Sequence, residues 1–94
     1  MTSVVGILVD GSPASQVQEG QHAEILLRET PFYAEMGGQI GDIGELVGAS
    51  GNMIVEDSQA PIAGVTVHCG AVGTGIIKVV DIVEARVESL QRQD

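Results

Sequence analysis

Residues 65–87 read VTVHCGAVGTGIIKVVDIVEARV, and this stretch decides the fold class of the 94-residue chain. It is rich in Val and Ile, whose branched side chains favour extended backbone. The glycines of residues 70–75 predict a turn, and Asp81 marks a second corner. Three strands are therefore expected from this stretch, at residues 65–69, 76–80 and 82–87.

The rest of the chain continues this pattern of short apolar runs separated by turn residues. Further strands are predicted at residues 4–9, 22–28, 45–47 and 53–57. Residues 48–52 favour a hairpin, Pro61 and Gly64 frame a crossing segment, and residues 88–94 are expected to begin a helix or to form a frayed tail. About seven strands at roughly ten-residue spacing predict an all-β fold, a small antiparallel β-barrel or a sandwich of about six to seven strands.

Length and charge limit the range of functions. A chain of 94 residues predicts one domain, residues 1–94. It carries 13 acidic and 4 basic residues, a net charge of −9. The basic residues are scattered along the chain: Arg28, Lys78, Arg86 and Arg92. Because Lys and Arg supply most of the affinity for nucleic-acid phosphates, we expect no independent grip on RNA and interpret the acidity chiefly as an aid to solubility.

Cysteine use and apolar patterning indicate the compartment. Cys69 is the single cysteine, so no internal disulfide is possible, and a reducing cytoplasm is expected. We interpret Cys69 as a buried structural thiol. The opening residues do not resemble a signal segment, and the apolar runs are too short to cross a bilayer. Cytoplasmic localisation without a membrane partner is therefore predicted.

The candidate metal ligands are few. They are His22, His68 and Cys69, and the last two, as neighbours on a strand, are expected to point to opposite faces. A zinc site would lack ligands, so no metal site is predicted. His68 is instead expected to be a half-buried histidine that makes one hydrogen bond.

No catalytic residue is predicted in this chain. Four serines are expected to lie in turns: Ser12, Ser15, Ser50 and Ser58. None of them occupies a Gly-x-Ser-x-Gly elbow, and adjacent strand positions prevent His68 from activating Cys69. The glycines of residues 37–41 lack the Lys-Ser/Thr pair of a phosphate-binding loop.

Residues 30–44, TPFYAEMGGQIGDIG, hold the unusual chemistry of the chain, including both of its aromatic residues, Phe32 and Tyr33. Two glycines before Gln39 allow close backbone approach to a partner, and the Gln39 amide can donate and accept hydrogen bonds. This stretch is therefore either a recognition loop, or a tight turn with Phe32 and Tyr33 plugging one barrel end. The residues alone favour neither interpretation.

The Gly37-Gly38-Gln39 tripeptide is similar to that of peptide-chain release factors, but a match of three residues with acidic neighbours is weak. The whole of residues 30–44 resembles the signature of alanyl-tRNA synthetases and their free-standing editing relatives. That signature has a Thr-Pro-Phe-Tyr-Ala-Glu run, a small residue, Gly-Gly-Gln and a Gly-Asp-x-Gly ending. Met36 departs from the small residue, and Val80 replaces a Gly that is common before the corner Asp.

The resemblance implies a small β-barrel similar to the second domain of translational GTPases. The barrel would lie between tRNA-recognition helices and an editing domain. By the same resemblance, Gly37, Gly38 and Gln39 would line the editing pocket. The residues that would shape the loop are Thr30, Pro31, Phe32, Tyr33, Glu35, Gly41 and Asp42.

The resemblance further implies that the chain is an accessory domain excised from a larger synthetase. The parent would use ATP to join alanine to its tRNA and would hydrolyse mischarged product. ATP, Mg and Zn would belong to other domains, with no cofactor in this chain. Its partners would be the neighbouring editing and tRNA-recognition domains, with tRNA bound only through the full-length enzyme and no activity in isolation. Two alternatives stay open: a purely structural or protein-docking acidic barrel, and a lone editing-type hydrolase.

Overall fold

The computed structural model describes residues 1–33, 41–62 and 65–88. Within these ranges the regular structure consists of eight strands and no helix, which confirms the all-β fold class. The strands are β1 (Thr2–Val9), β2 (Ser12–Ala14), β3 (Gln16–Gln18), β4 (His22–Leu27), β5 (Ile43–Gly48), β6 (Gly51–Ile62), β7 (Val65–Lys78) and β8 (Ile82–Glu88).

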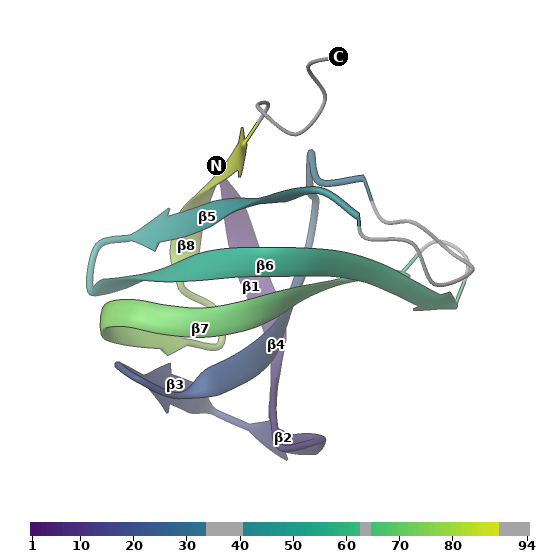
Figure 1. The fold of residues 1–94 in the computed structure, drawn as a ribbon. Helices are drawn as coiled ribbons and strands as arrows, with labels where there is room; N and C mark the ends of the chain where they lie inside the picture. Colours follow the sequence, from purple (N-terminus) through teal and green to yellow (C-terminus); the bar gives the residue numbers. More distant parts are fainter. Residues whose placement is uncertain (34–40, 63–64, 89–94) are drawn as a thin grey trace.

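Six of these strands form a closed antiparallel ring. Its order is β1, β4, β7, β6, β5 and β8, and β8 pairs with β1 through Thr2↔Val83 and Ser3↔Ile82. Figure 1 shows these strands wrapping around a common interior, with β5, β6 and β7 in front of β1 and β8. The two three-residue strands, β2 and β3, pair with β1 and β7 outside this ring. The barrel prediction is confirmed, and the strand count exceeds six to seven because of β2 and β3.

The barrel interior is almost entirely aliphatic. Alternate residues of each strand point inward, and burying one Val or Ile side chain contributes roughly 1.5–3 kcal/mol. The buried cluster consists of Val4, Ile7, Val17, Ala23, Ile25, Phe32, Leu46, Met53, Val55, Val72, Ile77 and Val83. Phe32 belongs to it although it lies after β4, so the signature contributes a core residue.

The glycines of residues 70–75 do not form a turn, and that prediction was wrong. β7 runs through them without a break. A Cβ atom on Gly70 would lie 1.8 Å from the Ile54 carbonyl oxygen, and one on Gly75 would lie 2.0 Å from the Ser50 carbonyl oxygen. These glycines therefore allow β7 to approach β6 closely.

The connections of the barrel were predicted with mixed success. The hairpin across residues 48–52 is confirmed, with Val47 opposite Asn52. The crossing segment at Pro61 was wrong, because β6 continues to Ile62, which pairs with Val65. Gly64 and residues 89–94 lie outside the described residues.

We predict that Gly70→Ala destabilises the chain by about 2–3 kcal/mol, because the added methyl group meets backbone that cannot rotate away. Gly73→Ala is the matched control. Its Cβ would lie 3.3 Å from the Asn52 side chain, so a change within about 0.5 kcal/mol is expected. Urea unfolding of the three proteins measures the difference. Equal unfolding free energies for the two variants would contradict the close approach of β6 and β7.

A second prediction concerns Val80, which is 78% exposed and has a φ of 74°. A β-branched residue in the left-handed region is strained by about 1–2 kcal/mol. Val80→Gly should therefore raise the unfolding free energy by about 1 kcal/mol. Val79→Gly should lower it, because Val79 packs against the core. A loss of stability in Val80→Gly would contradict the strain.

Candidate functional site

The structure describes both ends of the signature, residues 30–33 and 41–44. We call residues 30–33 the N-terminal stem, residues 41–42 the C-terminal stem, and residues 34–40 between them the Gly-Gly-Gln segment. The predicted pocket and loop residues in that segment lie outside the described residues: Glu35, Gly37, Gly38 and Gln39. The predicted loop-shaping residues Thr30, Pro31, Phe32, Tyr33, Gly41 and Asp42 are described.

The N-terminal stem is held by a buried histidine. The Thr30 hydroxyl lies 2.7 Å from His68 Nε2, and the other ring nitrogen, Nδ1, lies 2.8 Å from the Ile25 carbonyl oxygen. The Phe32 amide donates to the Thr30 hydroxyl oxygen at 3.0 Å. The Phe32 and His68 rings meet edge to face, with centroids 5.0 Å apart and an interplanar angle of 89°. The stem is thus joined to the barrel interior by the Thr30–His68 hydrogen bond and by the contact between the Phe32 and His68 rings.

These partners assign the tautomer of His68. A carbonyl oxygen only accepts hydrogen bonds, so Nδ1 carries the proton and donates to Ile25. In the neutral ring Nε2 is then an acceptor, and the Thr30 hydroxyl donates to it. Burial lowers the pKa of His68, and the hydrogen bond to Ile25 only partly offsets this. The neutral form, in which Nε2 accepts from Thr30, is therefore favoured.

The C-terminal stem is tied both to the N-terminal stem and to β6. The Tyr33 amide donates to Asp42 Oδ2 at 2.8 Å, and the Asp42 amide donates back to the Tyr33 carbonyl oxygen at 2.9 Å. On β6, Asp57 Oδ1 accepts the Gly41 amide at 2.8 Å. The Ser58 hydroxyl donates to the Asp42 carbonyl oxygen at 2.7 Å. Tyr33 and Asp42 therefore close the two stems against each other, and β6 holds the closure in place.

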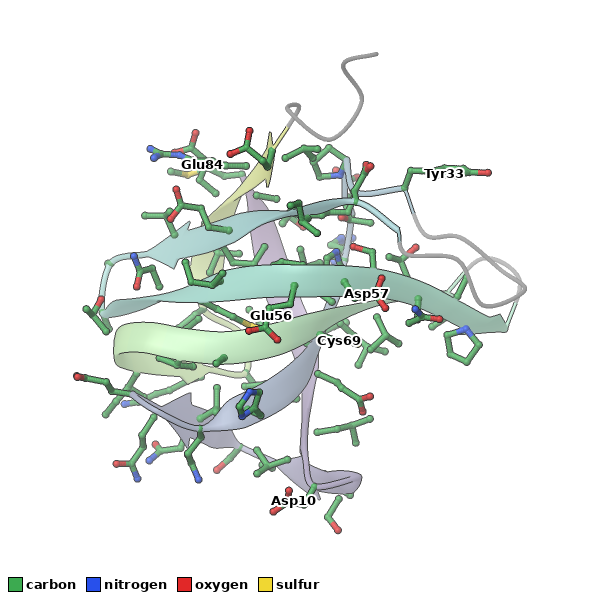
Figure 2. All side chains as sticks on the ribbon, in the orientation of Figure 1. Asp10, Tyr33, Glu56, Asp57, Cys69 and Glu84 are labelled. Atoms are coloured by element: carbon green, nitrogen blue, oxygen red, sulfur yellow. The ribbon has the colours of Figure 1, made fainter. Side chains whose placement is uncertain are left out.

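A β-bulge in β6 places Ser58 inside the barrel. Val55 pairs with Gly70 and Asp57 with Cys69, so β6 has one residue more than β7 between these pairs. Without the bulge, regular strand alternation from buried Val55 would turn Asp57 inward and Ser58 outward. With it, Ser58 is fully buried and Asp57 remains half-buried. Figure 2 shows Asp57 on β6, beside the exposed Glu56.

The two aromatic residues of the signature have opposite environments. Phe32 is 4% exposed and closes the barrel interior, whereas Tyr33 is 63% exposed. In Figure 2 the Tyr33 side chain points away from the strands. The interpretation of both rings as a plug is therefore right for Phe32 and wrong for Tyr33. The backbone of Tyr33, rather than its ring, takes part in the stem contacts.

The reactive side chains differ in burial from what the sequence predicted. His68 was expected to be half-buried with one hydrogen bond, but it is fully buried and has two partners. Cys69 lies on the opposite face and is half-buried. Burial, together with the charges of Glu24 and Asp57, raises the pKa of Cys69 to about 11, so its thiol is protonated and unreactive at neutral pH. Across the described part of the chain, His, Cys, Asp and Glu side chains nowhere gather in a group of three or more that could hold a metal ion.

Sequence reasoning missed two of the residues that hold the stems. Asp57 was assigned only to a strand, and Ser58 was expected in a turn, but it lies within β6. The turn assignment was wrong because Ser favours turns on average, and nothing local marks the bulge that buries it. A polar pair, Asp57-Ser58, at the end of an apolar strand was the available signal.

A surface groove lies beside the N-terminal stem. It is lined by Met1, Thr2, Glu29, Thr30, Pro31, Glu84 and Ala85. The Thr2 hydroxyl oxygen also accepts a hydrogen bond from the Glu29 amide at 2.9 Å, which ties the chain just after β4 to β1.

No helix among the described residues is long and apolar enough to span a membrane.

This chain is similar to known proteins over nearly its whole length. Residues 1–91 match the family model described as tRNA synthetases class II (A). The chain is 46% identical over 92 residues to the alanine–tRNA ligase of Chloroflexus aurantiacus, which covers 98% of this chain and 10% of that protein. Identity to the ligase of Roseiflexus castenholzii is 46% over 90 residues, which cover 96% of this chain and 10% of that ligase. Identity to the ligase of Myxococcus xanthus is 42% over 93 residues, which cover 97% of this chain and 10% of that ligase. The chain thus spans about a tenth of the length of these curated relatives, and no solved structure matches it.

The neutral His68 predicts a pH dependence of stability. Unfolding returns this imidazole to its ordinary pKa of about 6.5, whereas burial lowers its pKa in the folded state. Between these two values the unfolded chain binds more protons, so stability is complete above about pH 6.5 and falls as the pH decreases through this window. NMR titration of the His68 ring should give a midpoint below 6.5, with the Nδ1–H tautomer above it. A midpoint above 6.5 would contradict the assignment.

Proposed function

Because this chain belongs to the alanyl-tRNA synthetase family, we propose that it is an accessory barrel of an alanine–tRNA ligase. In this proposal the barrel positions the neighbouring editing domain and presents the Gly-Gly-Gln segment at the editing pocket. The parent enzyme joins alanine to its tRNA with ATP and hydrolyses mischarged tRNA, and it works in the cytoplasm. ATP, Mg and Zn are bound by other domains.

The closure of the two stems is the observation that carries the proposal. Tyr33 and Asp42 exchange two hydrogen bonds, and both ends of the closure are anchored on buried residues of the barrel. A rigid scaffold that holds both ends of a short segment reduces the entropy lost when that segment binds a ligand. This arrangement suits a recognition element and is more elaborate than a simple turn between β4 and β5 requires.

The chemistry of the barrel supports a presenting role rather than a catalytic one. Cys69 is held protonated by its surroundings. In the proposal, Gln39 contributes hydrogen bonds to the aminoacyl group, and the editing domain supplies the hydrolytic groups. A net charge of −9 opposes a phosphate backbone, so tRNA is held by other domains of the ligase.

The proposal is tested by Gln39→Ala in the full-length ligase. Loss of an amide that orients the substrate should lower the rate of deacylation of Ser- or Gly-charged tRNA by about ten- to a hundredfold, while alanylation stays unchanged. Gln18→Ala is the matched control, since Gln18 lies exposed on β3. Deacylation by Gln39→Ala at the wild-type rate would reject the pocket role, while membership of the family would stand.

The burial of Phe32 favours a second candidate, a structural barrel that docks its neighbours and never meets the editing substrate. In that case the stems serve only to close the barrel end. The same assay separates the two candidates. If the barrel only docks its neighbours, Gln39→Ala should deacylate mischarged tRNA at the wild-type rate. Any variant that displaces Phe32 should deacylate it more slowly.

A further inference from the structure

We infer that Ser58 and His68 form one positioning unit for the two stems that flank the Gly-Gly-Gln segment. These residues face each other across β6 and β7, and each holds one of the two stems. The inference rests on the proposed function for its consequence in editing, but its geometric part can be tested separately.

The geometry of the pair is direct. Ser58 and His68 are register partners on adjacent strands, and both are 0% exposed. Ser58 donates to the carbonyl oxygen of Asp42 on the C-terminal stem. His68 accepts from Thr30 on the N-terminal stem. One cross-strand pair therefore sets the separation of the two stems, and with it the positions of Tyr33 and Gly41 on either side of the segment.

The distribution of polar groups singles out this place in the barrel. Among the described residues, three polar or charged side chains are buried: Asp42, Ser58 and His68. All three lie at the stems, while the remaining buried cluster is hydrophobic. Burial of a polar group costs free energy that its hydrogen bonds only offset, so an apolar pair would serve a purely structural barrel at least as well.

The hydrogen bonds of the unit form a continuous chain. Ile25 on β4 accepts from His68, His68 accepts from Thr30, and Thr30 accepts from the Phe32 amide. Removing the Thr30 hydroxyl leaves Nε2 and the Phe32 amide without these partners. The stem is then expected to shift, because among the described contacts between this stem and the pair there remains the edge-to-face packing of Phe32 and His68.

The test uses the full-length ligase with Ser58→Ala and Thr30→Val, which remove the donor hydroxyls of the Ser58–Asp42 and Thr30–His68 hydrogen bonds with little change in volume. Thr30→Ser keeps the hydroxyl and is the conservative variant. Thr74→Val is the matched control, because the Thr74 hydroxyl donates to Asn52 at 2.8 Å across the same two strands, away from the stems.

We expect kcat for deacylation to fall about tenfold or more in Ser58→Ala and Thr30→Val. KM for mischarged tRNA and the rate of alanylation should stay within about twofold, since the tRNA is held elsewhere. Thr30→Ser and Thr74→Val should behave as wild type. If Gln39→Ala lowers deacylation and neither Ser58→Ala nor Thr30→Val does, the inference is wrong and the proposed function stands.

A second measurement separates positioning from general destabilisation. Hydrogen exchange of the 94-residue chain reports the Tyr33 and Asp42 amides, which donate across the stem closure. These amides should exchange about tenfold faster in Ser58→Ala and Thr30→Val, while amides of the β5–β8 ladder keep their rates. Equal acceleration of all amides would overturn the inference. Should Gln39→Ala leave deacylation unchanged, this measurement still decides whether the pair holds the stems.

Discussion

The barrel depends on one constraint: two polar side chains buried in an aliphatic interior must have hydrogen-bond partners. Ser58 and His68 lie opposite each other on β6 and β7, and both are fully buried. Each of them has a partner on one stem, because Ser58 donates to the Asp42 carbonyl oxygen and His68 accepts from Thr30. The same hydrogen bonds therefore satisfy the buried polar side chains and hold the stems. A change in the core side chains alters the stems, and a change in the stems alters the core.

The pairing of β6 with β7 creates this constraint. The bulge between Val55 and Asp57 changes which residues of β6 face inward, and Gly70 lets the β6 backbone pass within a distance that any side chain would block. A bulge of this kind commonly redirects a side chain next to a functional site. Here it exchanges an outward serine for an inward one and leaves Asp57 able to accept the Gly41 amide.

Sequence reasoning recovered the local features of the fold. Residues 4–9 and 82–87 were found as strands, the β5–β6 hairpin followed from its glycines, and Asp81 marked a real corner. One group of errors lies where glycine served a long-range purpose. Gly70 and Gly75 were interpreted as a turn, but both make room for a neighbouring strand, and no local pattern distinguishes these uses. The positions of Gly37, Gly38 and Gln39 remain a prediction, because they lie outside the described residues.

The amino-acid sequence alone determined the all-β class, since period-two runs of Val and Ile have few other stable arrangements. It also determined the family, since residues 30–44 carry a pattern that few folds would repeat by chance. Only the tertiary structure decided which polar residues are buried and what they hold. Burial of Ser58 requires a register between β6 and β7, and contact of His68 with Thr30 spans 38 positions of the chain. Such contacts depend on how the ring of strands closes, and closure is a property of the whole barrel rather than of any one segment.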